Sequence, residues 1–217
     1  MKWLRSFKPF WLIALLAFSP ISWADNVGDA VARLQASWAQ IQYQTPEKQQ
    51  AAAFEGLVAK AVEATAKYPD SPAAWAWSGI IRASYAGAKG GIGALSVVKK
   101  AKADLERAIE IDGSVLDGAA YTSLGSLYHQ VPGWPIGFGS DEKAEQYLRE
   151  GLKFGAEDVD ANYFYAAYLF DQKDYERALK YAKRAEAAPA DPDRPVASKG
   201  RLAEVKDLKG RIKEKIR

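Results

Sequence analysis

Small and aromatic residues recur with the same spacing in three stretches of the chain. The clearest stretch runs from Asn162 to Pro189, where a proline follows a series of regularly spaced alanines. Two earlier stretches repeat the same order of residue sizes, which predicts a structural repeat. The corresponding residues are Trp75, Gly79, Ala101, Leu105 and Ala108, then Tyr121, Leu124, Gly125, Tyr128, Ala144, Leu148 and Gly151, and then Ala166, Tyr175, Ala178, Ala182 and Ala185.

The small residues in the second half of each repeat are seven positions apart, at 101 and 108, at 144 and 151, and at 178 and 185. Because seven residues make two turns of an α-helix, both lie on one helix face. A face without bulky side chains lets a neighbouring helix approach to roughly 8–10 Å. Each repeat therefore predicts an antiparallel helix pair, and such pairs bury their apolar faces by stacking. No β-branched run alternates with polar residues, so we expect an all-α fold.

These residues resemble the tetratricopeptide repeat (TPR) family, which has an aromatic residue, Leu-Gly and Tyr on the first helix, and Ala, an aromatic residue, Ala and Pro on the second. The best match runs from Asp174 to Leu179, and the middle repeat keeps Leu124, Gly125 and Tyr128. The resemblance covers roughly residues 27–192, most strongly from 119 onward. It implies a right-handed superhelical stack of about three to four pairs within 25–195. An upstream pair would have its second helix from about Pro46 to Lys67.

The last segment, 196–217, predicts an amphipathic capping helix after a proline-containing linker. From Lys199 onward it has eight basic and three acidic residues. Repeat arrays need a terminal cap that covers the last pair and turns a polar face to water. The alternative is a peripheral membrane contact, in which the basic surface touches anionic lipid or an acidic partner. The predicted apolar stripe consists of Leu202, Val205, Leu208, Ile212 and Ile216.

The first 24 residues predict a secretory signal peptide. Three basic residues precede an apolar run from Phe10 to Phe18, and Ser22-Trp23-Ala24 resembles a cleavage site. We therefore expect a periplasmic or secreted protein cut near Ala24. Cleavage would leave 27 basic and 27 acidic residues, so no general basic field for nucleic acid remains. The absence of cysteine excludes disulfides, thiolate metal ligands and a lipid-modified N-terminal cysteine.

Two of the repeats carry insertions between their paired helices. The distance from the small residue of the first helix to that of the second is 12 residues at 166–178, but 19 at 125–144 and 22 at 79–101. We expect the inserted loops to be neighbours at one edge of the array. The first, around 87–93, is rich in glycine, whereas the second contains Trp134 and Phe138. These aromatic side chains either anchor their loop on the helices below or form an exposed binding rim.

The resemblance places the binding groove along the first helices of the pairs. No Lys, Arg or Asn occupies the matching positions, which argues against a chaperone-tail adaptor. An apolar groove with a few hydroxyls suits an apolar helix, an extended segment or a small amphipathic molecule. Other groove positions are Ala73, Ala76, Ile80, Ala83 and Ala167. The candidate partner-binding or ligand-binding residues are Thr122, Ser126, His129, Trp134, Phe138, Tyr163, Phe170 and Asp171.

Catalytic, cofactor and metal sites have little support in the sequence. His129 is the only histidine, and a structural role fits it better than that of a general base. We therefore expect no enzyme, and an exported TPR-like scaffold that binds a protein partner in the cell envelope. The alternative is a ligand-binding accessory protein of envelope transport, similar to the repeat component of some tripartite periplasmic transporters. A large closed apolar cavity would favour this alternative, and an open groove would favour the scaffold.

Overall fold

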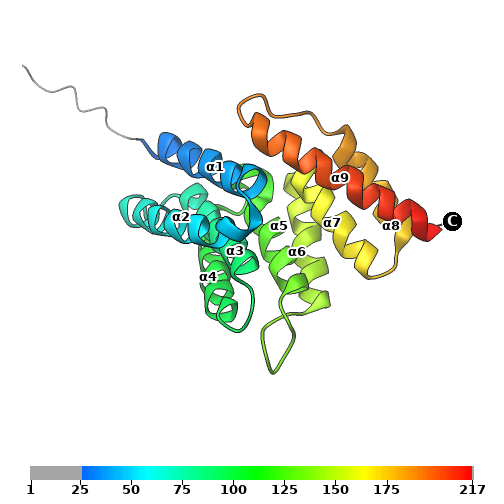
Figure 1. Ribbon diagram of the computed structural model, residues 1–217, viewed down its shortest axis with the longest axis horizontal. Helices are drawn as coiled ribbons and strands as arrows, with labels where there is room; N and C mark the ends of the chain where they lie inside the picture. The colour runs from blue at the N-terminus through cyan, green and yellow to red at the C-terminus, as the bar shows by residue number, and fades with distance from the viewer. Residues whose placement is uncertain (1–25, 217) are drawn as a thin grey trace, which may run out of the picture.

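The computed structural model describes residues 26–216, so the predicted signal peptide lies outside the described residues. All regular structure in this range is helical, as expected, and it contains no strand (Figure 1). None of its helices has the length and hydropathy needed to cross a membrane. The helices are α1 (Val27–Gln44), α2 (Glu47–Lys67), α3 (Pro72–Lys89), α4 (Ala94–Asp112), α5 (Val115–Gln130), α6 (Asp141–Phe154), α7 (Val159–Asp171), α8 (Tyr175–Ala187) and α9 (Pro195–Ile216).

Consecutive helices pack against each other, most extensively α3 with α4, α5 with α6, and α7 with α8. The small residues predicted to face a neighbouring helix are buried, which confirms the seven-residue spacing as a packing signal. A methyl group on Gly125 would lie 2.7 Å from Leu148 Cγ and 3.1 Å from the Ala144 carbonyl oxygen. On Gly79 it would lie 2.7 Å from Leu105 Cδ2 and 3.0 Å from the Ala101 carbonyl oxygen. The two pairs therefore use equivalent residues for the same close approach.

A hydroxyl residue directly before a helix predicts an N-cap at Thr45, Ser71 and Ser140, and the structure agrees at two of these three places. Ser71 and Ser140 each accept a hydrogen bond from the backbone N–H three residues later. The Thr45-Pro46 sequence also predicts a cap, but the prediction is wrong there. Pro46 itself precedes the first residue of α2, and the Thr45 hydroxyl donates to the carbonyl of Gln40 in α1.

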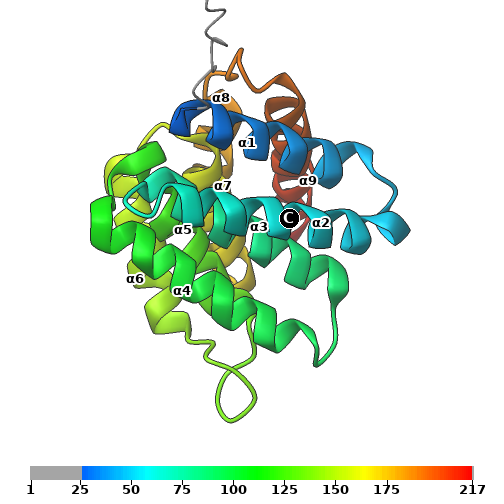
Figure 2. The same cartoon turned by 90° about the vertical axis from the view of Figure 1, so that its left-hand side faces the viewer.

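The two insertions take different forms. Around 87–93 the extra residues lengthen α3 and α4, which leaves only residues 90–93 between them. The glycine-rich stretch is therefore not the inserted loop that we expected, because Gly87 and its neighbours continue α3. Between α5 and α6 the helices are not lengthened, and residues 131–140 form a loop that projects from the molecule (Figures 1 and 2). The two insertions lie at the same edge, and Lys102 of α4 reaches to 5.9 Å from the Phe138 ring centroid.

The C-terminal helix α9 packs against α8 and also contacts α7 and α1. Val205, Leu208 and Ile212 of the predicted stripe are buried, whereas Ile216 is exposed. The stripe is thus engaged with the rest of the fold, as a capping helix requires, and it is not available as a lipid-facing surface. By reaching α1, α9 also brings the last helix against the first.

Five helices form a closed cycle of contacts, in which α1 contacts α3, α3 contacts α5, α5 contacts α7, α7 contacts α9 and α9 contacts α1. We call these five helices the helix ring. The first helix of each pair belongs to it, and α9 completes it. Each of the helices α2, α4, α6 and α8 packs against the ring helix that precedes it and the one that follows it.

Candidate functional site

The helix ring surrounds a central hollow of about 1600 Å³. The groove positions Ile80, Ala83, Ser126 and Tyr163 line it, together with residues of α1 and α9. Several lining residues at helix ends are exposed, so the hollow opens to solvent. These exposed residues include Glu47, Leu116, Asp117, Gln130, Glu157 and Asp193.

Aromatic side chains form part of the wall. Trp38 and Trp77 meet edge to face with ring centroids 5.7 Å apart, and the Trp38 indole N–H donates to Ser84 Oγ at 2.8 Å. The lining also contains Tyr43, Phe154 and Phe164. The wall thus combines flat apolar rings with hydroxyl groups, which suits a ligand that has both apolar and polar parts.

Thr122 lines the hollow but is only 3% exposed. Its side chain faces α6, because a methyl group on Gly151 would collide with the Thr122 hydroxyl oxygen. This close contact leaves little of the Thr122 side chain to meet an occupant. Ser126, one turn further along α5, is less buried and is better placed for that role.

His129 and Asp171 lie together but outside the lining of the hollow. His129 Nε2 is 2.9 Å from Asp171 Oδ2, and its Nδ1 is 3.6 Å from Asp141 Oδ1. The His129 ring also meets Tyr168 edge to face, at 5.3 Å between centroids. This arrangement joins the C-terminal end of α5 to α7 and α6, which fits a structural role for the histidine. Among the described residues, no group of three or more His, Cys, Asp or Glu side chains could hold a metal ion.

Residues of α9 cover two of the other predicted groove positions. The Arg211 guanidinium lies 4.7 Å from the Phe170 ring centroid, and that of Arg201 lies 4.6 Å from the Tyr163 centroid. Tyr163 remains in the lining of the hollow, whereas Phe170 does not line it. The sequence placed both on the groove, but it gave no sign that the last helix would lie over them.

The two aromatic residues of the loop between α5 and α6 lie in different environments. Phe138 packs on the core and meets Tyr128 edge to face at 5.3 Å, as an anchoring residue would. Trp134 is 89% exposed, and the nearby Ile136 is 64% exposed. Trp134 therefore does not fold back onto the helices. Neither residue lines the central hollow.

A buried arginine joins α9 to α7, close to the contact of α9 with α1. Arg201 is 8% exposed, and it pairs with Asp160 of α7 and with Glu204 of its own helix. Burial lowers the pKa of the Arg201 guanidinium, but Asp160, Tyr43 and Glu204 outweigh this effect and raise the pKa above its ordinary value, so the guanidinium stays charged. The backbone of Gly200 lies against the Tyr43 ring of α1, where no methyl group would fit. We call Tyr43, Asp160, Tyr163, Arg201 and Glu204 the closure cluster.

The lining of the hollow has a strong excess of negative charge. Its only two basic residues among those that the structure describes are Arg194 and Arg201. Burial, the negative charge of Asp160 and that of Asp117 together raise the pKa of Asp158 from 3.8 to about 6. The sequence analysis missed this feature. The nine acidic residues are Glu47, Asp117, Glu157, Asp158, Asp160, Glu186, Asp191, Asp193 and Glu204.

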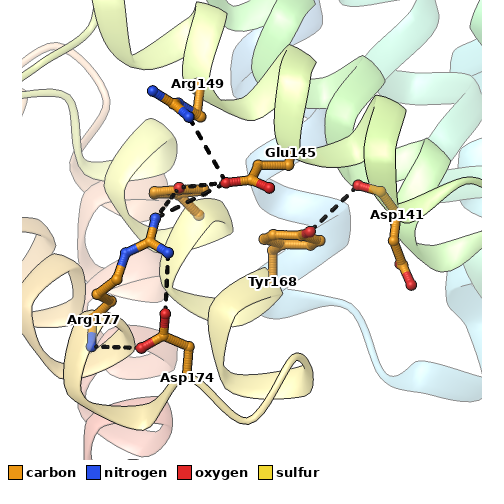
Figure 3. A network of polar contacts seen from close by, with 7 residues as sticks. Asp141, Glu145, Arg149, Tyr168, Asp174 and Arg177 are labelled. Carbon is orange, nitrogen blue, oxygen red and sulfur yellow. Dashed lines mark hydrogen bonds and ion pairs between the residues drawn. The ribbon is translucent and has the colours of Figure 1, made fainter.

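A second, smaller hollow of about 310 Å³ has basic walls, and three of its four cations lie near a carboxylate. Arg177 pairs with Asp174 at 3.0 Å (Figure 3). It also donates to the Tyr165 hydroxyl at 2.6 Å. Glu145 lies 4.0 Å from both Arg177 and Arg149. This polar network links α6, α7 and α8, and its cations have carboxylate partners nearby. The small hollow therefore fits a structural role better than an anion site.

Comparison with known proteins does not add a family assignment. No protein-family profile matches the chain, and no curated protein is similar to it. The feature that points to a function is therefore the central hollow, through its chemistry and geometry.

Proposed function

We propose that the protein is an exported TPR-like scaffold that holds a polypeptide segment of a partner in its central hollow. The observation that supports this most is the volume of about 1600 Å³ within the helix ring, which exceeds the roughly 300–1,000 Å³ of pockets for small molecules. The repeated close approach at Gly79 and Gly125 supports a right-handed stack of helix pairs. Export is inferred from the sequence of residues 1–24.

Site-specific photo-crosslinking tests the position of the partner. A photoreactive amino acid at Ser126, in the lining of the hollow, should give an adduct with a segment of a partner protein in the native envelope. The same amino acid at Gln146, an exposed position of α6 outside the lining, is the matched control. Equal adducts from both positions, or none from Ser126, would contradict the proposal. Sequencing the N-terminus of the exported protein tests cleavage after Ala24.

A ligand-binding accessory protein of envelope transport is the second candidate. The encirclement of the hollow by five helices favours it, because enclosed sites retain small ligands better than open grooves do. The acidic and hydroxyl-rich lining favours it less, since the expected cavity for this role was apolar. Native mass spectrometry of the purified protein would decide between the two candidates if it found a bound small molecule and no bound peptide.

A further inference from the structure

We propose that the occupant of the central hollow is a basic polypeptide segment in which lysine or arginine alternates with apolar residues. This inference rests on the proposed function, and it specifies the chemistry of the partner. It depends on the charge of the lining, on the ion pairs that its arginines already form and on its aromatic side chains.

The charge of the lining differs from that of the chain as a whole. The full chain has 30 basic and 27 acidic residues, but the hollow has nine acidic and two basic residues among those described. Clefts lined by one sign of charge focus the electric field and attract a partner of the opposite sign. The negative lining therefore selects a cationic occupant and opposes an acidic one.

The arginines of the lining do not neutralise it. Arg201 is engaged by Asp160 and Glu204, and Arg194 pairs with Asp191 at 2.6 Å. Glu186 pairs with Lys209 of α9. The remaining acidic residues form no ion pair with any cation in the described part of the chain. These residues are Glu47, Asp117, Glu157, Asp158 and Asp193.

The unpaired carboxylates come from different elements, and two of them lie close together. Asp117 in the first turn of α5 and Asp158 before α7 both lie against Gly155, and Asp158 also faces Arg194 before α9. Glu47 belongs to the first turn of α2. Carboxylates on several helices suit an extended segment that has more than one cationic side chain.

The aromatic side chains of the lining can contact the apolar parts of such a segment. Lysine and arginine have long apolar stems that pack on flat rings while the charged head contacts a carboxylate or a ring face. The Arg201 guanidinium already stacks on Tyr163 and Phe164 at 4.6 and 4.7 Å, which shows the geometry in this protein. Trp38, which is partly exposed, offers a similar surface further along the wall, whereas Trp77 behind it is 5% exposed.

Two labelled peptides with the same length and apolar content test the inference. One repeats Lys-Ala-Lys-Leu three times and the other repeats Glu-Ala-Glu-Leu three times. Fluorescence anisotropy should show that the basic peptide binds the protein, more weakly at high salt, and that the acidic peptide does not. Free spermine, a polyamine without a peptide backbone, should compete poorly. Equal binding of both peptides, no binding of the basic one, or full displacement by dilute spermine would overturn the inference.

A variant that lacks three carboxylates of the hollow tests whether the basic peptide binds there. The triple substitution Asp117→Asn, Glu157→Gln and Asp193→Asn should weaken binding of the basic peptide about tenfold or more, because it removes three carboxylates from the hollow. The matched control removes three exposed carboxylates outside the hollow, by the substitutions Glu142→Gln, Glu176→Gln and Glu214→Gln. The affinity of this control for the basic peptide should stay within about twofold of that of the natural protein. Equal affinities of the two variants would contradict the assignment. Circular dichroism checks that both are folded.

The two proposals fail in different ways. If photo-crosslinking from Ser126 traps a partner segment with no excess of basic residues, the cationic occupant is wrong while the scaffold function stands. If the basic peptide binds the hollow but no partner is trapped there, the chemistry of the site stands and the scaffold function fails.

Discussion

The helices α5 and α6 meet at Gly125 through small apolar groups, whereas α9 meets α7 and α1 around a buried charge. At Gly125 the contact is with the side chain and backbone of Leu148, and nothing ionisable takes part. At the other contact, Arg201 is held by Asp160 and Glu204 while the backbone of Gly200 lies against Tyr43.

The two kinds of contact should respond differently to salt, to pH and to substitutions. Close packing of apolar groups depends little on salt or pH, and it can be disturbed only by a change of volume. A buried ion pair depends on every partner being present, because the loss of one partner leaves an uncompensated charge. We therefore expect the contact of α5 with α6 at Gly125 to be permanent and the contacts of α9 with α7 and α1 to be the adjustable ones.

The largest expected effect is at the packed contact. Gly125→Leu should lower the free energy of unfolding by about 4 kcal/mol, because even a methyl group would lie 2.8 Å from the Leu148 backbone nitrogen. Gly56→Leu is the control, since no atom lies within 4 Å of the corresponding position on α2. Urea unfolding measures both. A Gly125→Leu protein as stable as the control would show that the pairs are loosely packed.

A smaller and more local effect is expected at the closure cluster. Arg201→Met should cost about 3 kcal/mol, since Asp160 and Glu204 lose their shared cation. Hydrogen exchange should show lost protection in α9 and α1 and unchanged protection in α5 and α6. Adding Asp160→Asn and Glu204→Gln should restore part of the stability. Uniform loss of protection across all helices would remove the distinction between the two contacts.

The carboxyl group of Asp158 should make the stability of the fold depend on pH. Its pKa of about 6 in the folded protein lies above the ordinary 3.8, so the ionised carboxylate destabilises the fold. Stability should therefore fall as the pH rises from about 4 through 6, by about 2 kcal/mol. Asp158→Asn keeps an acceptor for the Ala161 N–H and removes the charge, so it should be more stable than the natural protein at pH 7 and similar at pH 4. Thermal melts at both pH values measure this, and a stabilisation that is equal at both would contradict it.

The smallest expected effect is in the loop between α5 and α6. Trp134→Ala should change the free energy of unfolding by less than about 0.5 kcal/mol, because the side chain is 89% exposed. Phe138→Ala, four residues away, should cost about 1–2 kcal/mol since it removes an aromatic ring that packs on Tyr128. A larger loss for Trp134→Ala than for Phe138→Ala in chemical denaturation would reverse these assignments.

The sequence predicted the contacts that depend on local spacing. The close approach of helices at Gly125 and the small residues facing it follow from helix geometry, which the sequence spacing records directly. The capping of α3 by Ser71 follows from the chemistry of a hydroxyl before a proline. The stretch around Gly87 was misread, because glycine disfavours a helix intrinsically but does not prevent one that lengthens an existing α3.

The contact of α1 with α9 could not be predicted, because it depends on the small rotation that each successive pair adds to the array. For the same reason the acidic lining was missed. Asp117, Glu157 and Asp193 are far apart in sequence, and each alone is typical of a solvated helix end. A usable signal was nevertheless present, since acidic residues recur in the segments that lead from one pair to the next.

The closed cycle of contacts ties the last helix of the array to the first. A row of repeats with free ends can bend along its length, whereas here α9 is held against both α7 and α1. The width of the hollow should therefore follow the contacts of α9, which the buried charge of Arg201 supports through Asp160 and Glu204.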